Sequence, residues 1–380
     1  MILRELPVVS KKIIVTRIIC VCWFIGKIMS WKLWIAGRLF PVVPVFDVLH
    51  APAFVHVLLF ILSLTGLILL FLFPAKRIFQ ITIIIIETIT CLLDQNRLQP
   101  WEYEYAFMII TVMINFKKDD DAVKSIMFIL ISIYFYSGLG KMNRIFSQIL
   151  MQDITHINIK DLLDAYWYRF ITYHSGYILG LLEVFFAMGL LFKIKQKIAA
   201  WLLILMHCSI IVVFSPLILN YDVIILPWNM AFALMLYFLF IRKQGGSPFS
   251  FIFLRNKRNW LIVVLFGAFP LLNFFGYWDN FLSANLFSYK NPGMFIYIQQ
   301  PSVNNPLSKY YEAFPAPDGK QRVAINVRSW AFKEMHVPEY PEMRIYKKIK
   351  SQLMQRYPGM VADYVVTVYK NGKRIIIPLK

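Results

Sequence analysis

Charged residues are scarce in this chain of 380 residues. They make up 16% of the sequence, whereas a soluble globular domain carries roughly 25%. Internal repeats and low-complexity runs are also lacking, and 59% of the residues are hydrophobic. This composition excludes an ordinary soluble domain and predicts an integral membrane protein in a lipid bilayer.

Metal-binding and disulfide motifs are absent as well. The six histidines lie far apart without an HxxH or HExxH pattern, so no metal site is expected. The cysteines lie in apolar stretches without CxxC spacing, which favours buried free thiols acting as small apolar residues. A redox role for the CxC pair remains an alternative. The four cysteines are Cys20, Cys22, Cys91 and Cys208.

Basic residues exceed acidic ones by 19, since 40 lysines and arginines stand against 21 aspartates and glutamates. Most of the excess flanks apolar segments, where such residues set membrane orientation, so nucleic-acid binding is not expected. These clusters fall on one side of the predicted membrane, and the positive-inside rule assigns that side to the cytoplasm. The N-terminus is thus predicted to be cytoplasmic and the C-terminal domain extracytoplasmic. The clusters begin near Lys11, Lys76, Lys117, Lys193 and Arg242.

Apolar segments long enough to cross a bilayer dominate residues 1–279. The first is interrupted by Arg17 and Lys27 and precedes no small-residue cleavage site, so we expect it to be retained rather than cleaved as a signal peptide. The predicted fold class is an all-α polytopic membrane bundle of about nine transmembrane helices, followed by a small C-terminal α+β extramembrane domain. The expected spans are 13–29, 51–74, 78–93, 103–116, 123–140, 171–193, 198–217, 222–241 and 259–277.

Residues 280–380 have a different pattern. The stretches 293–299 and 321–328 predict strands, and apolar residues at helical spacing predict a helix over 342–357. Two further apolar stretches flank Asn371-Gly372, a pair that accepts the positive φ of a tight turn. The sequence therefore predicts a β-hairpin near the C-terminus. The amphipathic segment 141–170 is expected to lie along the membrane interface.

The first candidate site is a polar cluster where the third expected span ends. Asp94 and Arg97 are spaced to pair at i,i+3. Glu87 lies seven residues before Asp94, so both face one side of the helix. A carboxylate within a membrane is costly and is usually functional. The alternative is a structural turn in which an ion pair locks two helices.

The second candidate site lies at the end of the fifth expected span. Tyr134, Ser137 and Lys141 occupy i, i+3 and i+7 and therefore share a helix face. Gly138 and Gly140 permit close packing or the approach of a ligand. A lysine in an apolar pocket loses the solvation of its charged form and can act as a general base. The alternative is a lysine that snorkels to the interface.

The third candidate site combines His207, inside a span, with Asn220 and the stretch Pro227-Trp228-Asn229 beyond it. Glu183 and His174 are further polar residues in the preceding expected span. Together they suggest a proton route to the outer face of the membrane. The alternative for His207 is a hydrogen bond between helices. The sequence predicts one pocket lined by Asp94, Arg97, Tyr134, Lys141, His207 and Asn220.

These motifs resemble those of a known family. The stretches 93–105 and 134–143, together with His207, Asn220 and Pro227-Trp228, are similar to the HTTM (vitamin K-dependent gamma-carboxylase-like) membrane family. The resemblance implies an enzyme that uses a quinone or vitamin K-like hydroquinone as cofactor, with Lys141 as the base that deprotonates the reduced form. It also implies roles for several other residues. These are His207 and Asp94 in catalysis, and Arg97, Trp101, Tyr134, Ser137 and Asn220 in cofactor binding.

One departure bears on the cofactor. Trp101 stands where the carboxylases have a histidine, which argues against vitamin K itself. The stretch around Lys141 is also similar to DoxX/MauE-type redox-associated membrane proteins. That second resemblance implies a factor that assists a redox protein partner without catalysis of its own. A structural membrane scaffold is the third interpretation.

Overall fold

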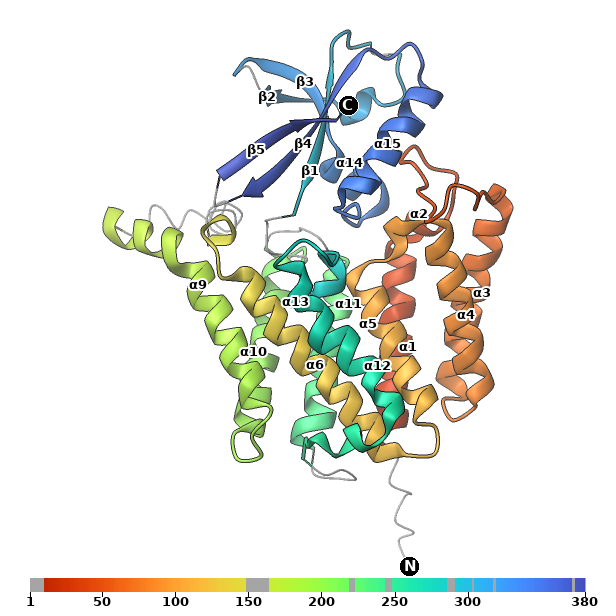
Figure 1. The fold of residues 1–380 in the computed structure, drawn as a ribbon, viewed down its shortest axis with the longest axis vertical. Helices are drawn as coiled ribbons and strands as arrows, with labels where there is room; N and C mark the ends of the chain where they lie inside the picture. The colour runs from red at the N-terminus through yellow and green to blue at the C-terminus, as the bar shows by residue number, and fades with distance from the viewer. Residues whose placement is uncertain are drawn as a thin grey trace, which may run out of the picture.

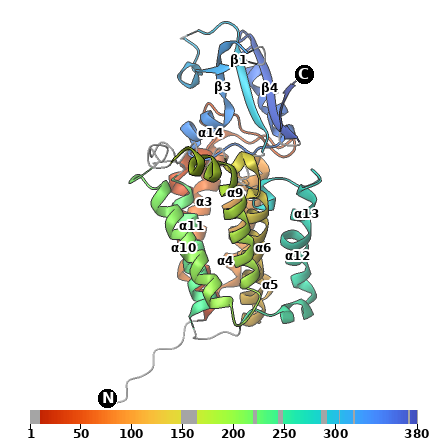
Figure 2. The same ribbon diagram turned by 90° about the vertical axis from the view of Figure 1, so that its left-hand side faces the viewer.

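The computed structural model describes residues 10–147, 164–218, 223–242, 248–285, 291–302, 304–316, 319–370 and 373–379. It consists of a helical bundle and a five-stranded antiparallel sheet that stands beyond one end of the bundle (Figures 1 and 2). The main helices of the bundle are α1 (Lys11–Met29), α2 (Trp31–Trp34), α3 (Ala53–Leu72), α4 (Arg77–Leu93), α5 (Pro100–Ile114), α6 (Asp119–Lys141), α9 (Ala165–Gly189), α10 (Gln196–Phe214) and α11 (Ile225–Leu236).

Helical structure covers each of the nine apolar segments named above. The eighth continues from α11 into a π-helical stretch, η2 (Tyr237–Ile241). The ninth is α12 (Trp260–Val263), the π-helical η5 (Val264–Ala268) and α13 (Phe269–Asn273). Within the described residues, only α3, α6 and α10 are long and apolar enough to cross a membrane, with α9 a fourth if its bent halves form one span. A count of nine spans is therefore not confirmed.

The loops that carry basic residues meet at one end of the bundle. Lys12 Nζ donates a 2.9 Å hydrogen bond to the carbonyl of Phe116 and pairs with Asp119. Asn115 Nδ2 donates to Asn259 Oδ1 at 2.7 Å. At the opposite end, Gln95 N donates to the carbonyl of Val43 at 2.7 Å, so the loops around residues 43 and 95 adjoin there.

The sheet has the strand order β2-β3-β1-β4-β5. Its strands are β1 (Gly293–Ile298), β2 (Glu312–Pro315), β3 (Gln321–Asn326), β4 (Ala362–Lys370) and β5 (Lys373–Pro378). Lys370 pairs with Lys373, so a two-residue loop joins β4 and β5, which confirms the expected hairpin. The turn residues 371–372 lie outside the described residues, as do residues 148–163 of the expected interfacial segment.

Two helices accompany the sheet: α14 (Val327–Met335) and α15 (Met343–Arg356). The expected helix over 342–357 is α15. The strand expected over 321–328 stops at Asn326, because the Asn326 side chain accepts hydrogen bonds from Arg328 N at 3.0 Å and Ser329 N at 3.3 Å and so caps α14. Neither α14 nor β2 was expected from the sequence.

The C-terminal part docks on the polar end of the bundle. Glu334 of α14 accepts hydrogen bonds from Leu39 N at 2.7 Å and Phe40 N at 3.0 Å. Gln99 Nε2 donates to the carbonyl of Pro338 at 2.9 Å, and Tyr340 N donates to Asn96 Oδ1 at 3.2 Å. These bonds join backbone groups that would otherwise be buried without partners.

Candidate functional site

A small cavity opens beside the C-terminal half of α6. It has a volume of about 70 Å³ and walls from α6, α9, α10 and α11, with Ala284 on a further side. Three acidic residues in the first turn of α6 and Lys141 in its last turn complement the helix dipole. The predicted face is confirmed, because Tyr134, Ser137 and Lys141 all line this cavity.

Lys141 is held by a carboxylate from the neighbouring helix. Its Nζ lies 2.5 Å from Glu183 Oε2 of α9 and donates to Ser137 Oγ, one turn back, at 2.9 Å. The Glu183 side chain is buried, whereas the Lys141 side chain is 17% exposed. A buried carboxylate needs such a partner, because an unpaired charge in an apolar interior is costly. Lys141 is thus paired within the bundle and does not snorkel away from it.

Two glycines let α6 and α9 approach closely enough for this pair. A Cβ built on Gly138 would lie 2.7 Å from the carbonyl oxygen of Gly180, and one on Gly180 would lie 2.5 Å from that of Gly138. Real Cβ atoms do not occur at such distances, so both positions require glycine at this separation. The sequence interpretation of Gly138 as a close-packing residue is confirmed.

A second hydrogen-bonded chain lines the opposite part of the cavity. Tyr134 OH lies 2.7 Å from His207 Nε2, and His207 Nδ1 lies 2.7 Å from Asn229 Oδ1. Asn229 Nδ2 donates to the carbonyl of Ile225 at 2.8 Å, which fixes the amide with its oxygen toward His207. The network therefore assigns the ring proton to Nδ1, so that Nε2 accepts from Tyr134.

The remaining walls are mainly apolar. Trp228 of α11 lines the cavity and donates from Nε1 to Glu104 of α5 at 2.8 Å. Ala284 has φ 56°, in the left-handed region that residues with a Cβ seldom occupy. Such strain is often retained where a ligand or catalytic group must be positioned. Asn220, a predicted member of the site, lies outside the described residues.

Asp94 and Arg97 belong to a different cluster, between the bundle and the C-terminal part. Asp94 pairs with Arg38 and accepts hydrogen bonds from Val43 N at 3.1 Å and from Asn96 N and Nδ2 at 3.2 and 3.0 Å. Arg97 Nε is 3.9 Å from Asp94 Oδ2, so the expected i,i+3 pair exists but is the weaker one. Arg38 was not identified from the sequence as the principal partner.

Arg97 is fully buried and donates in several directions. Its donors reach the carbonyls of Leu33 at 3.1 Å, Thr90 at 3.2 Å and Trp34 at 3.0 Å, and Nη2 reaches His56 Nδ1 at 2.8 Å. Burial lowers the pKa of Arg97 to about 10, while Asp94 opposes this shift, so the guanidinium stays protonated at neutral pH. Asp94 and Arg97 therefore order the loops on which α14 docks.

A further buried ion cluster lies on the same side of the bundle. Lys27 of α1 is 2.8 Å from Glu87 Oε2 and 3.3 Å from Glu102 Oε2, and its Nζ lies 3.2 Å from the ring centroid of Trp34. All three charged side chains are at most 2% exposed. The sequence signal was present, because a lysine inside an apolar span is functional or paired by default.

The single predicted pocket is therefore divided in two. Tyr134, Ser137, Lys141 and His207 come together at one cavity, whereas Asp94 and Arg97 do not line it. Trp101 also lies outside this cavity. Its ring packs edge-on against Trp34, with 6.0 Å between the ring centroids. The physical reason is that every oxygen of Asp94 is already occupied by donors from residues 38–43 and 96. Among the described residues no group of histidine, cysteine and acidic side chains is suited to a metal ion.

Comparison with known proteins adds no family assignment. No protein-family model, no curated protein and no solved structure matches this chain.

Proposed function

We propose that the chain is a multi-pass membrane protein of HTTM type that binds the polar head of a lipophilic, quinone-like molecule and moves a proton on it. The observation that carries this proposal is the pairing of two polar networks at one cavity. Lys141 and Glu183 face Tyr134 and His207 across a space enclosed by four helices. Such convergent polar groups in an apolar site are typical of ligand sites.

The cavity suits a hydroxyl-bearing head better than a large ligand. Its volume of about 70 Å³ is far below the roughly 300 Å³ of a site for a whole drug-sized molecule. Oxygen acceptors, an ammonium donor and aromatic walls meet there, and a hydroquinone oxygen requires these groups. An apolar tail would lie outside, along the exposed side chains of α9 and α10, which include Leu181, Phe185 and Leu205.

Each residue has a distinct part in this proposal. The Glu183 carboxylate is the group of the pair with a free acceptor oxygen, so it receives a proton from the bound hydroxyl. The Lys141 ammonium then stabilises the negative oxygen that remains. If Lys141 passes a proton to Glu183 first, its amine becomes the base, as the family resemblance implies. His207 Nε2 holds Tyr134 in place and can accept the proton of its hydroxyl.

The finer topology belongs to the same proposal. We propose that all nine helical segments cross the bilayer, with the basic loops cytoplasmic and the sheet extracytoplasmic. The shared location of the basic loops at one end supports this orientation. The cavity would then lie near the outer leaflet, because Lys141 ends α6 at the other end.

The test uses the purified full-length protein and a short-tailed naphthohydroquinone under anaerobic conditions. Calorimetry measures binding, and ultraviolet absorption at pH 7 measures the ionised fraction of the bound probe. We expect the wild type to bind and ionise the probe. Lys141→Met should reduce the ionised fraction by at least about tenfold, because the cation that stabilises the ionised oxygen is lost, and Glu183→Gln should reduce it because the proton acceptor is lost.

The matched control is Lys118→Met, which removes a 65%-exposed lysine at the start of the same helix. This variant should bind and ionise the probe as the wild type does. Failure of the wild type to bind, or equal ionisation by Lys141→Met, would reject the function. If the double variant Lys141→Met/Glu183→Met instead only raises the melting temperature, the scaffold interpretation is favoured, because replacing a whole buried ion pair by apolar residues removes its desolvation cost.

A further inference from the structure

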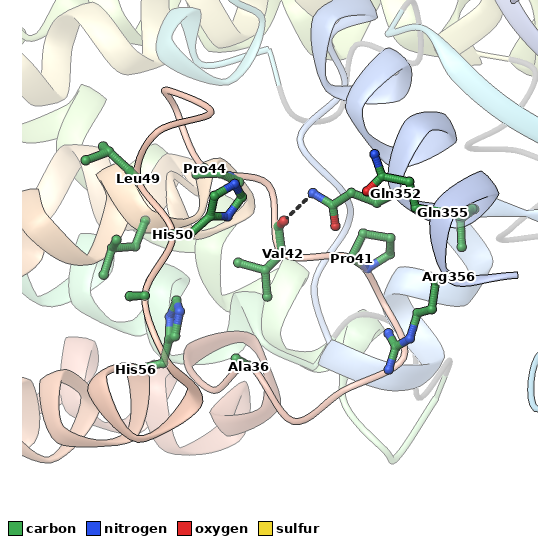
Figure 3. A pocket seen from close by; sticks show the side chains of 13 residues that line it. Ala36, Pro41, Val42, Pro44, Leu49, His50, His56, Gln352, Gln355 and Arg356 are labelled. Carbon is green, nitrogen blue, oxygen red and sulfur yellow. Dashed lines mark hydrogen bonds between the residues drawn. The ribbon is translucent and has the colours of Figure 1, made fainter.

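A second cavity lies between the bundle and the C-terminal part, away from Lys141. It has a volume of about 450 Å³ and is bordered by the loop 36–51, the ends of α3 and α4, and α15. Figure 3 shows His50 and His56 on one side and Gln352, Gln355 and Arg356 on the other, with Val42 between them. Gln352 Nε2 donates to the carbonyl of Val42 at 2.7 Å and fixes this wall.

The lining of this cavity contains no carboxylate. Its polar members are two histidines, two glutamines and Arg356, and the rest are alanine, proline, valine and leucine. Arg356 Nη1 lies 3.4 and 3.3 Å from the carbonyls of Arg38 and Leu39, which holds the guanidinium at the rim. The carboxylate near His50, that of Asp47, lies outside the lining and is paired with Lys348 at 2.7 Å. A lining of donors and a guanidinium favours an anionic ligand.

The buried charges behind the cavity reinforce this polarity. Lys27, Arg38 and Arg97 face Glu87, Asp94 and Glu102, so the six formal charges cancel. The charges are unevenly distributed, however. Near the cavity two arginines share the single carboxylate of Asp94, which leaves an excess positive charge there, whereas two glutamates share Lys27. Arg97 donates to Nδ1 of His56, which itself lines the cavity and therefore carries its ring proton on Nε2.

The start of α3 adds a further positive contribution. Its first turn contains no acidic residue, and Pro52 supplies no side-chain cap. The partial positive charge of this helix end therefore faces His50 and Ala51 without compensation. Phe54 and Leu58 on α3 are exposed, and α3 is the most apolar of the candidate spans. A membrane-spanning α3 would bring this cavity to the level of lipid headgroups.

We propose that this cavity binds a phosphate-bearing anion, with Arg356 as its principal charged contact and His50 and Gln355 beside it. A phospholipid headgroup and free phosphate share this chemistry. The position at the end of α3 favours the headgroup of an anionic phospholipid, whose acyl chains would follow the apolar outer face of that helix.

The test measures binding by calorimetry to the full-length, delipidated protein in neutral detergent. Dihexanoyl phosphatidylglycerol is the anionic probe, dihexanoyl phosphatidylcholine is the zwitterionic one, and inorganic phosphate represents the free ion. We expect phosphatidylglycerol to bind at least about tenfold more tightly than phosphatidylcholine. Arg356→Gln should weaken it by about tenfold, the usual worth of one charged hydrogen bond. Lys347→Gln, an exposed lysine of α15 that does not line the cavity, should change nothing.

A second variant tests whether Arg356→Gln weakens binding only because it changes the packing of α15. Gln355 is exposed, so Gln355→Glu should fold normally yet repel the anion, whereas the same change at exposed Gln321 of β3 should be silent. Equal binding of inorganic phosphate would support the anion site and reject the lipid as its source. The proposal is overturned if phosphatidylglycerol binds no better than phosphatidylcholine, or if Arg356→Gln and Gln355→Glu bind as the wild type does.

Discussion

Two charged residues near helix ends, Asp94 and Lys141, illustrate how differently similar sequence signals are used. Asp94 accepts hydrogen bonds from backbone and side-chain donors and pairs with Arg38, with no space left around it. Lys141 has one carboxylate partner and an adjoining cavity. Only the second arrangement adjoins a cavity, so Asp94 has a structural role, whereas the chemical role proposed above falls to Lys141.

Asp94→Asn should destabilise the protein severely. The amide keeps the shape of the side chain but leaves Arg38 and Arg97 buried without a counter-charge. Removing one partner of a buried pair costs about 3–5 kcal/mol. The measurement is the free energy of unfolding of the purified protein in detergent, followed by circular dichroism.

The control for this substitution is Asp363→Asn. Asp363 is 51% exposed and 4.0 Å from Arg322, so its loss should cost no more than about 1 kcal/mol. Equal stability of the two variants would contradict the structural role of Asp94.

At the scale of elements, the crossing of α6 and α9 decides whether the Lys141 cavity exists. Gly138 and Gly180 touch backbone to backbone, and the Lys141–Glu183 pair forms close to this contact. Because the two partners sit on different helices, their distance depends on the helix separation. Positioning by packed helices is more exact than positioning by loops.

Gly138→Ala should separate α6 from α9. The added methyl group would lie 2.7 Å from the Gly180 carbonyl and 2.9 Å from Val184 N, and backbone atoms cannot give way as side chains do. Overpacking of this kind costs about 1–3 kcal/mol. We expect a lower melting temperature and weaker binding of the naphthohydroquinone probe.

Gly26→Ala provides the matched control in α1. There the new Cβ would lie 3.8 Å from the Trp101 ring, an ordinary contact. Alanine in a helix interior is favoured over glycine by about 0.5–1 kcal/mol, so this variant should be as stable as the wild type or slightly more so. Loss of stability in Gly26→Ala alone would contradict the packing argument.

Much of the element pattern could be predicted from the sequence, because apolar periodicity and turn residues are local. The nine helical segments, the hairpin around residues 371–372 and the shared face of Tyr134, Ser137 and Lys141 follow from such patterns. The strand over 321–328 was wrong at its end, since the capping by Asn326 outweighs the local strand pattern.

The partners across the bundle could not be predicted. Glu183 lies 42 residues from Lys141, and Arg38 lies 56 residues from Asp94. Spacing along one helix says nothing about which neighbouring helix supplies the opposite charge. For the same reason the sequence merged two clusters into one pocket, although Asp94 faces the loop that follows α2 and Lys141 faces α9.

At the scale of the whole molecule, many groups join the sheet-bearing part to the bundle, and Glu334 of α14 is one of them. Glu334 accepts from Leu39 N and Phe40 N and from Trp330 Nε1, and the Trp330 ring packs on Phe40 at 4.9 Å between centroids. These bonds, together with the hydrogen bond from Gln352 to Val42, hold the loop that also lines the Arg356 cavity. Docking and anion binding are therefore coupled through residues 38–42.

Glu334→Ala should loosen this contact. Three donors lose their acceptor, and leaving buried donors unsatisfied costs about 1–3 kcal/mol each. We expect faster amide hydrogen exchange at Leu39 and Phe40, measured by mass spectrometry of peptides from residues 36–45. The bundle helices should exchange as before.

Glu312→Ala is the control, because its pair with Lys333 is exposed on the same part of the molecule. Such a surface pair contributes at most about 1 kcal/mol, and exchange at residues 36–45 should not change. Unchanged exchange in Glu334→Ala would show that other contacts hold the two parts together.

The ammonium of Lys27 has a consequence for biosynthesis. Its partner Glu87 follows 60 residues later along the chain, and Glu102 is later still. In the proposed topology, α1 is therefore synthesised before either carboxylate that neutralises its buried ammonium. We expect α1 to reach its final position in the membrane only after α4 and α5 have been made.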